Sequence, residues 1–141
     1  SWLIHEAALV VGDLDLLKKV EPVIVKIAEA ADEGLNPDGS MIYENFVSKG
    51  KIDRELHWWV QAENVVGHVN LFQHFGDEEA LQIALRCWNF IQTKLVDKLH
   101  GEWHWSLYAD GTINMKDDKA GFWKCPYHNG RMCMEILERF S

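Results

Sequence analysis

The sequence lacks the long apolar run and the excess of positive charge that several classes of protein require. No stretch of the 141 residues approaches the roughly 18 to 20 apolar residues that span a bilayer. Nothing at the start resembles a basic region followed by an apolar signal segment. Lys and Arg number 14 against 22 Asp and Glu, which gives a formal charge of -8. Because an acidic surface repels a polyanion, we expect neither a nucleic-acid nor a membrane partner.

Cysteine motifs and cofactor motifs are also missing. The three cysteines, Cys87, Cys125 and Cys133, contain no Cys-x-x-Cys pair and cannot all pair within one chain. This favours a reduced, cytoplasmic setting. Cys125 and His128 have Cys-x-x-His spacing, but no second ligand pair accompanies them, so the sequence predicts no metal. It has no glycine-rich phosphate loop and no Ser elbow, and we predict no cofactor.

Tryptophan, in contrast, is abundant. The chain has seven Trp, several of them beside His and Glu, and 48% of its residues are hydrophobic. Sugar-binding sites use Trp because the apolar face of a pyranose stacks on an indole. A tryptophan-rich helix core explains the same composition, and composition alone favours that core.

Apolar residues recur at helical spacing in several segments, separated by turn signals. Gly-Asp pairs at 12–13 and 76–77 read as helix stops followed by caps. Short, partly alternating segments at 40–54 and 101–112 predict β-like excursions with turns. The predicted helices cover residues 2–11, 14–31, 58–75, 78–96 and 127–140.

These segments form a repeat of helix, Gly-Asp turn, helix and excursion. The two Gly-Asp pairs stand 64 positions apart, and Gly39 and Gly101 stand 62 apart. Such hairpins must stack, as an open solenoid or a closed ring, to bury their apolar faces. Long excursions on one side favour a closed α/α toroid. Six hairpins would need about 370 residues, so this sequence reads as part of a ring.

The first candidate cluster is HWWVQAE at residues 57–63, where a helix begins. Trp59 and Glu63 lie four residues apart, so one helix face can present an indole and a carboxylate to the same ligand. The alternative is that Trp59 is core and Glu63 is an acid favoured by the helix dipole.

The second cluster is WKCPYHNGR at residues 123–131. Pro126 favours the first turn of a helix and so places His128 near the start of the last helix. Arg131, three residues further, either stabilises a developing oxyanion or pairs with Glu135. From spacing alone, a single His of this kind is more often structural than catalytic.

Together these clusters, with Gly76-Asp77 and Gly101-Glu102-Trp103, resemble the C-terminal part of the N-acylglucosamine 2-epimerase family. The PYHNGR form is typical of its cellobiose 2-epimerase branch. The resemblance covers essentially all 141 residues. It implies an all-α fold with short β excursions, in which residues 1–141 form the C-terminal portion of a single (α/α)6 barrel domain.

The resemblance also implies an isomerase reaction. The family interconverts glucose and mannose configurations at C2 of a reducing-end sugar, as in cellobiose to glucosyl-mannose. The ring opens, the C2 proton beside the C1 carbonyl is removed, and an enediolate is reprotonated on its other face. Two bases on opposite faces suit this chemistry.

The family's site residues map onto this sequence one by one. His128 matches one of two catalytic histidines, and Glu63 matches a carboxylate that lies near the reacting groups or orients a histidine. Trp59 and Trp123 match aromatics that stack on the sugar, with Trp58 and Arg131 as further substrate contacts.

The family's other histidine lies in a His-Asp-Ile-Glu stretch directly before the Ser-Trp-Leu that opens this chain. His5 does not replace it, because His5 lies inside the following helix. We therefore expect residues 1–141 alone to be inactive. Helices cut from a ring expose an apolar face, through which we expect a homo-oligomer.

Three alternatives remain open. In the first, the enzyme is an N-acylglucosamine 2-epimerase or an aldose–ketose isomerase, whose reactions share the enediolate step. In the second, the chain is a helical-repeat binding module without chemistry, in which His128, Glu63 and Trp123 point to different surfaces. In the third, the chain belongs to an α/α-barrel glycosidase, which requires two pocket carboxylates, although Glu63 has no evident partner.

Overall fold

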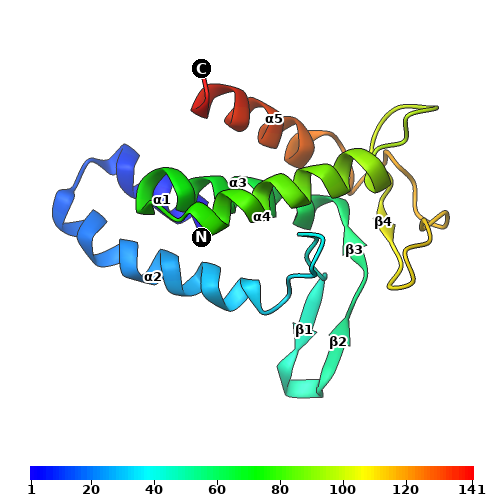
Figure 1. Cartoon of the computed structure of the whole chain (residues 1–141), viewed down its shortest axis with the longest axis horizontal. Helices are drawn as coiled ribbons and strands as arrows, with labels where there is room; N and C mark the ends of the chain where they lie inside the picture. Colours follow the sequence, from blue (N-terminus) through cyan, green and yellow to red (C-terminus); the bar gives the residue numbers. More distant parts are fainter.

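Five α-helices carry most of the fold in the computed structural model, which describes residues 1–141 (Figure 1). The predicted all-α class is confirmed. The predicted helix at 78–96 is α-helical only to Phe90 and then forms a π-helical turn, η2 (Ile91–Leu95). None of the helices combines the length and the apolar character that a bilayer crossing requires. The five helices are α1 (Trp2–Val11), α2 (Leu14–Asp32), α3 (Trp58–Phe75), α4 (Glu78–Phe90) and α5 (Tyr127–Arg139).

The Gly-Asp pairs end one helix and begin the next, as predicted. Gly12 and Gly76 have φ angles of 72° and 70°, in the left-handed region that favours glycine. The side chains of Asp13 and Asp77 then accept hydrogen bonds from backbone N–H groups in the first turns of α2 and α4. Each pair therefore defines a helical hairpin.

Two small antiparallel β pairs extend from the helices. The first joins β1 (Glu44–Phe46) to β2 (Lys51–Asp53) through a 3-10 turn, η1 (Val47–Lys49), and projects below the helices in Figure 1. The second pairs β3 (Leu56–His57) with β4 (Ser106–Leu107). The predicted extended segment at 101–112 is mostly irregular, with the predicted turn at 108–112 closed by a bridge between Leu107 and Ile113. Its one regular strand pairs with a segment far away in the sequence, which local alternation does not reveal.

Helix α3 is the centre of the fold, and it packs against α1, α4 and α5. Its residues are buried along most of its length, because neighbours cover several of its faces. The main hydrophobic core surrounds it. That core contains Trp2, Trp58, Ala62, Val65, Val66, Cys87, Phe90, Ile91, Leu95, Trp103, Leu107 and Met132.

Polar side chains of α3 hold the loop before β1 in place. Gln61 donates through Nε2 to the Met41 carbonyl and accepts the Met41 N–H at Oε1, both at 2.8 Å. Asn64 donates to the Gly39 carbonyl at 2.9 Å. These bonds satisfy buried backbone groups of the loop and so fix the first β pair beside the start of α3.

Gly39→Ala is expected to destabilise the fold by at least ~2 kcal/mol, because it combines backbone strain with a steric clash. Gly39 has a φ of 82°, and a Cβ there would lie 2.6 Å from the Cys87 backbone nitrogen. Gly111 is a matched control, since its φ is 83° and nothing lies within 4 Å. Urea unfolding should show a smaller loss of unfolding free energy for Gly111→Ala than for Gly39→Ala. Equal losses would show that the close packing at Gly39 does not add to the destabilisation.

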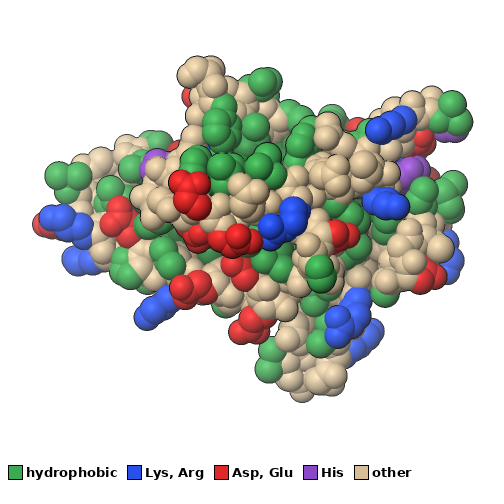
Figure 2. All heavy atoms as spheres, viewed as in Figure 1, with side chains coloured by type: hydrophobic (Ala, Val, Ile, Leu, Met, Phe, Trp, Pro, Cys, Tyr) green, Lys and Arg blue, Asp and Glu red, His purple; other side chains and the backbone are tan.

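Apolar side chains remain open to solvent on the outer helices. On α5, Met134 is 64% exposed and Leu137 is 73% exposed, where Figure 2 shows hydrophobic atoms at the top of the molecule. Val10 on α1 is 85% exposed and Leu14 on α2 is 69% exposed. The predicted self-association would use such faces, and it stays a prediction.

Candidate active site

The beginnings of α3 and α5 bring three predicted site residues together. His128 Nδ1 lies 2.7 Å from Glu63 Oε1, although the two residues are 65 positions apart. The Arg131 guanidinium donates to the same Glu63 oxygen. The Trp2 indole N–H donates to the other oxygen, Oε2, at 2.8 Å. Both carboxylate oxygens of Glu63 are therefore engaged by donors.

This arrangement keeps Glu63 ionised. Burial by itself would raise the pKa of the Glu63 carboxyl, but hydrogen bonds from His128, Arg131 and Trp2 and the charge of Arg131 outweigh it and hold the pKa below 4.5. Near neutral pH the site therefore contains a fixed carboxylate beside an imidazole.

The ionised carboxylate decides the tautomer that we assign to His128. The Arg131 guanidinium has only donors and lies 3.3 Å from His128 Nδ1, a contact that by itself would favour an unprotonated Nδ1. The Glu63 oxygen is closer and, when ionised, can only accept. An unprotonated Nδ1 would place its lone pair against a carboxylate oxygen at 2.7 Å. Nδ1 therefore carries a hydrogen and donates to Glu63, which leaves Nε2 as the ring nitrogen that can take up a proton from a ligand.

Aromatic rings surround the imidazole. The Trp59 ring lies 5.6 Å from it at an interplanar angle of 33°, and Trp59 is 36% exposed. Trp58 lies 5.3 Å away, nearly perpendicular, and is only 1% exposed. The Tyr127 ring is 4.1 Å away. Trp58 is thus a buried support, and of the two α3 indoles Trp59 is the one open to solvent.

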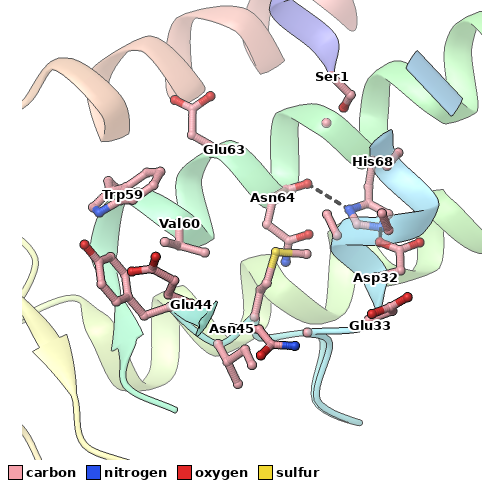
Figure 3. A pocket seen from close by; sticks show the side chains of 18 of the residues that line it. Ser1, Asp32, Glu33, Glu44, Asn45, Trp59, Val60, Glu63, Asn64 and His68 are labelled. Atoms are coloured by element: carbon pink, nitrogen blue, oxygen red, sulfur yellow. Dashed lines mark hydrogen bonds and ion pairs between the residues drawn. The ribbon is translucent and has the colours of Figure 1, made fainter. Parts of the chain in front are cut away.

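A cleft of about 600 Å³ opens beside this cluster. Trp59 and Glu63 of α3 line one end, and Asp32 and His68 lie toward the other (Figure 3). Tyr43 also lines the cleft and meets the Trp59 ring edge-on at 6.2 Å. His128 does not line this cleft itself but adjoins it at Glu63. A ligand stacked on Trp59 would therefore lie next to the imidazole.

The structure brings five of the six predicted site residues together. The sixth, Trp123, is 76% exposed in the loop before α5 and contacts Phe122, with ring centroids 4.9 Å apart. Its predicted sugar contact stays a prediction. Sequence reasoning did not select Trp2 or Tyr43, because neither is close in sequence to Glu63 or Trp59. The five clustered residues are Trp58, Trp59, Glu63, His128 and Arg131.

Paired helices joined by Gly-Asp turns and followed by short β pairs, with a His–Glu–Arg cluster near the starts of α3 and α5, fit part of an α/α toroid. The sequence profile of the N-acylglucosamine 2-epimerase (GlcNAc 2-epimerase) family matches residues 2–130. The chain belongs to this family.

Individual relatives agree with that assignment. The chain is 63% identical over 137 residues to a cellobiose 2-epimerase of Bacteroides fragilis, covering 97% of this chain and 35% of the relative. A crystal structure of a sugar epimerase from a ruminal bacterium matches with a TM-score of 0.92 at 40% identity, over 99% of this chain and 36% of the other. The cellobiose 2-epimerase of Bacillus thermoamylovorans matches with a TM-score of 0.84 at 40% identity, over 98% and 35%. The chain thus spans about a third of the length of these relatives.

Proposed function

We propose that residues 1–141 are the C-terminal portion of the single α/α-barrel catalytic domain of a sugar 2-epimerase. Its reaction interconverts glucose and mannose configurations at C2 of a reducing-end sugar, with cellobiose converted to glucosyl-mannose. The observation that carries the proposal is the 2.7 Å contact between His128 Nδ1 and Glu63 Oε1, which leaves Nε2 as a base beside an aromatic cleft. The names of the relatives support the same reaction class.

His128 would act on the opened sugar at its C2 carbon. Nε2 accepts the C2 proton while the C1 carbonyl oxygen takes up negative charge, which gives an enediolate. The ionised Glu63 stabilises the imidazolium that forms, and its hydrogen bond fixes the ring orientation. Trp59 offers a flat apolar surface for the sugar face. Ring opening and closure break and form the C1–O5 bond with acid–base assistance, and the C2 steps are proton transfers, so no cofactor is proposed.

Reprotonation from the opposite face needs a second acid–base group, which gives a proton to C2. The clustered site contains one histidine, and by the family resemblance the other belongs to a His-Asp-Ile-Glu stretch outside residues 1–141. We therefore propose that this chain alone does not epimerise sugars. The three free cysteines support the accompanying proposal of a reduced, cytoplasmic setting.

The glycosidase alternative fits this site poorly. A glycosidase acid must be free to give its proton to a leaving group. Glu63 instead accepts hydrogen bonds from Trp2, His128 and Arg131, and these hold it ionised. An aldose–ketose isomerase would use the same first step, so its products must be distinguished by experiment.

The test follows C2 chemistry directly. The full gene product is incubated with cellobiose in heavy water, and proton NMR follows deuterium at C2 and the mannose-configured product. Both are expected, whereas a ketose product would favour the isomerase. Absence of exchange with cellobiose and other reducing sugars would overturn the proposed function and favour a binding module.

Trp59→Ala in the full gene product is expected to raise KM for cellobiose about tenfold, because losing one stacking surface costs ~1.4 kcal/mol. The value of kcat should change less, since Trp59 does not hold Glu63. Phe140→Ala is the control, because Phe140 lies at the C-terminal end of α5, is 55% exposed and should leave both constants unchanged. An unaltered KM in Trp59→Ala would remove the stacking role.

A further inference from the structure

Lys124 is a buried cation just before α5, and the proposed chemistry gives it no role. Its side chain is 1% exposed, and lysine is almost never buried without partners. It does not line the cleft beside Trp59 and Glu63. The sequence places it four residues before His128.

The Lys124 ammonium group uses all three of its hydrogens. Nζ donates to the Trp103 carbonyl at 2.8 Å, to the Lys119 carbonyl at 2.6 Å and to Glu102 Oε1 at 3.1 Å. It also lies 4.7 Å from the centre of the Trp58 ring. An ammonium group with every donor engaged is fixed in place. It therefore joins the 101–103 segment, the loop before α5 and helix α3 at one point.

Two chains of contacts connect the Lys124 ammonium group to His128. Glu102 Oε1, besides accepting from Lys124, accepts from Asn129 Nδ2 at 2.9 Å, and Asn129 is the residue after His128. Trp58, under the Lys124 ammonium, is the buried ring that contacts His128 at 5.3 Å. One route fixes the backbone at the first turn of α5, and the other fixes the support behind the imidazole.

The backbone and the carboxylate of Glu102 are both constrained where the 101–103 segment meets Lys124. Its φ angle of 61° is the one positive value at a residue other than glycine in the chain. Burial would raise the pKa of its carboxyl, but hydrogen bonds from the Trp103 N–H, Lys124 and Asn129 outweigh it and lower the pKa. Burial also lowers the pKa of Lys124, and Glu102 opposes that change.

We propose that Lys124 is a positioning residue for the epimerisation: it fixes Trp58 and the Glu102–Asn129 link so that His128 meets Glu63. This rests on the proposed function. Lys124 touches no substrate in this role. Its removal should misplace the imidazole while leaving the sugar-stacking surface of Trp59 intact.

The test compares two Lys→Met variants of the full gene product. Lys124→Met keeps most of the side-chain stem but loses the hydrogen bonds and the charge over Trp58. Lys119→Met is the matched control, because Lys119 lies in the same loop before α5 as Lys124. Its ammonium group donates to the Asp97 carboxylate and the Gly101 carbonyl but to neither Trp58 nor Glu102. We expect kcat to fall at least tenfold in Lys124→Met with KM for cellobiose within threefold. Lys119→Met should stay within twofold of the parent in both constants.

A second readout reports on His128 without relying on turnover. In 15N-histidine-labelled protein, the Nδ1 proton bound to Glu63 should give a downfield resonance, assigned by its loss in His128→Asn. This resonance should shift or broaden in Lys124→Met and persist in Lys119→Met. Should Lys124→Met fail to fold, Asn129→Ala removes the bond to Glu102 and a local bond from the Gly130 N–H, leaves Lys124 over Trp58, and should move the same resonance.

The outcomes separate the two proposals. Unchanged kcat and an unchanged His128 resonance in Lys124→Met would overturn the positioning role. So would equal losses in both Lys variants, because loosening of the loop would then explain them. A parent protein that shows no C2 exchange would overturn the proposed function, while the His128 resonance would still decide whether Lys124 positions the imidazole.

Discussion

His128→Asn in the full gene product is expected to lower the rate of deuterium incorporation at C2 of cellobiose about 10³-fold, because general-base catalysis contributes roughly that much. Asn is the informative replacement. Its side-chain amide nitrogen overlaps His128 Nδ1 and can still donate to Glu63, which Nδ1 contacts at 2.7 Å. The variant therefore keeps the structural bond and loses only the basic Nε2.

A matched control separates loss of the base from a general effect of replacing histidine. His100 has a 71% exposed side chain paired with Asp97, away from the cluster. His100→Asn should leave C2 exchange and thermal stability unchanged, and His128→Asn should leave stability nearly unchanged. Full exchange in a folded His128→Asn variant would exclude His128 as a base.

Local sequence signals predicted the helices well, because each boundary depends on neighbouring residues. Gly12 and Gly76 adopt left-handed conformations that a side chain would disfavour, and the aspartates after them satisfy the first turns of the next helices. Pro126, at the N-cap of α5, marked the start of that helix in the same way.

Contacts between distant segments could not be predicted from spacing. The pairing of Leu56 with Leu107 joins two short strands that have no common local pattern. Lys124 reads as a surface charge until the segment at 101–103 folds over it. Spacing also left open whether Trp59 and Glu63 were core or site, and the convergence of Glu63 with His128 depends on the packing of α3 against α5.

Family resemblance supplied what spacing left open, and it did so unevenly. It selected His128, Glu63 and Arg131, which the structure joins at one carboxylate oxygen. It selected Trp123 equally, although that side chain lies exposed against Phe122. A motif identifies residue types used by a family, whereas only the packing of helices shows which of them meet within this chain.

Glu63→Gln is expected to lower kcat for epimerisation about 10² to 10³-fold while His128 remains in place. A neutral amide no longer favours the proton on Nδ1, so a fraction of the imidazole carries its proton on Nε2 and cannot act as a base there. The imidazolium formed in the reaction also loses its counter-charge. Arg131 also loses its ionic partner at a partly buried position. Steady-state kinetics on cellobiose should show the loss mainly in kcat.

Stability should respond to the same substitution in a pH-dependent way. The folded-state pKa of Glu63 lies below its ordinary value of 4.5, so the carboxylate stabilises the fold above that pH. This contribution is lost as pH falls through the lower, folded-state value. The difference in unfolding free energy between parent and Glu63→Gln should therefore be largest near neutrality and shrink on acidification. Glu138→Gln, at an exposed position on α5, should show no such dependence. A difference that stays constant from neutral to acid pH would mean that the charge of Glu63 does not stabilise this cluster.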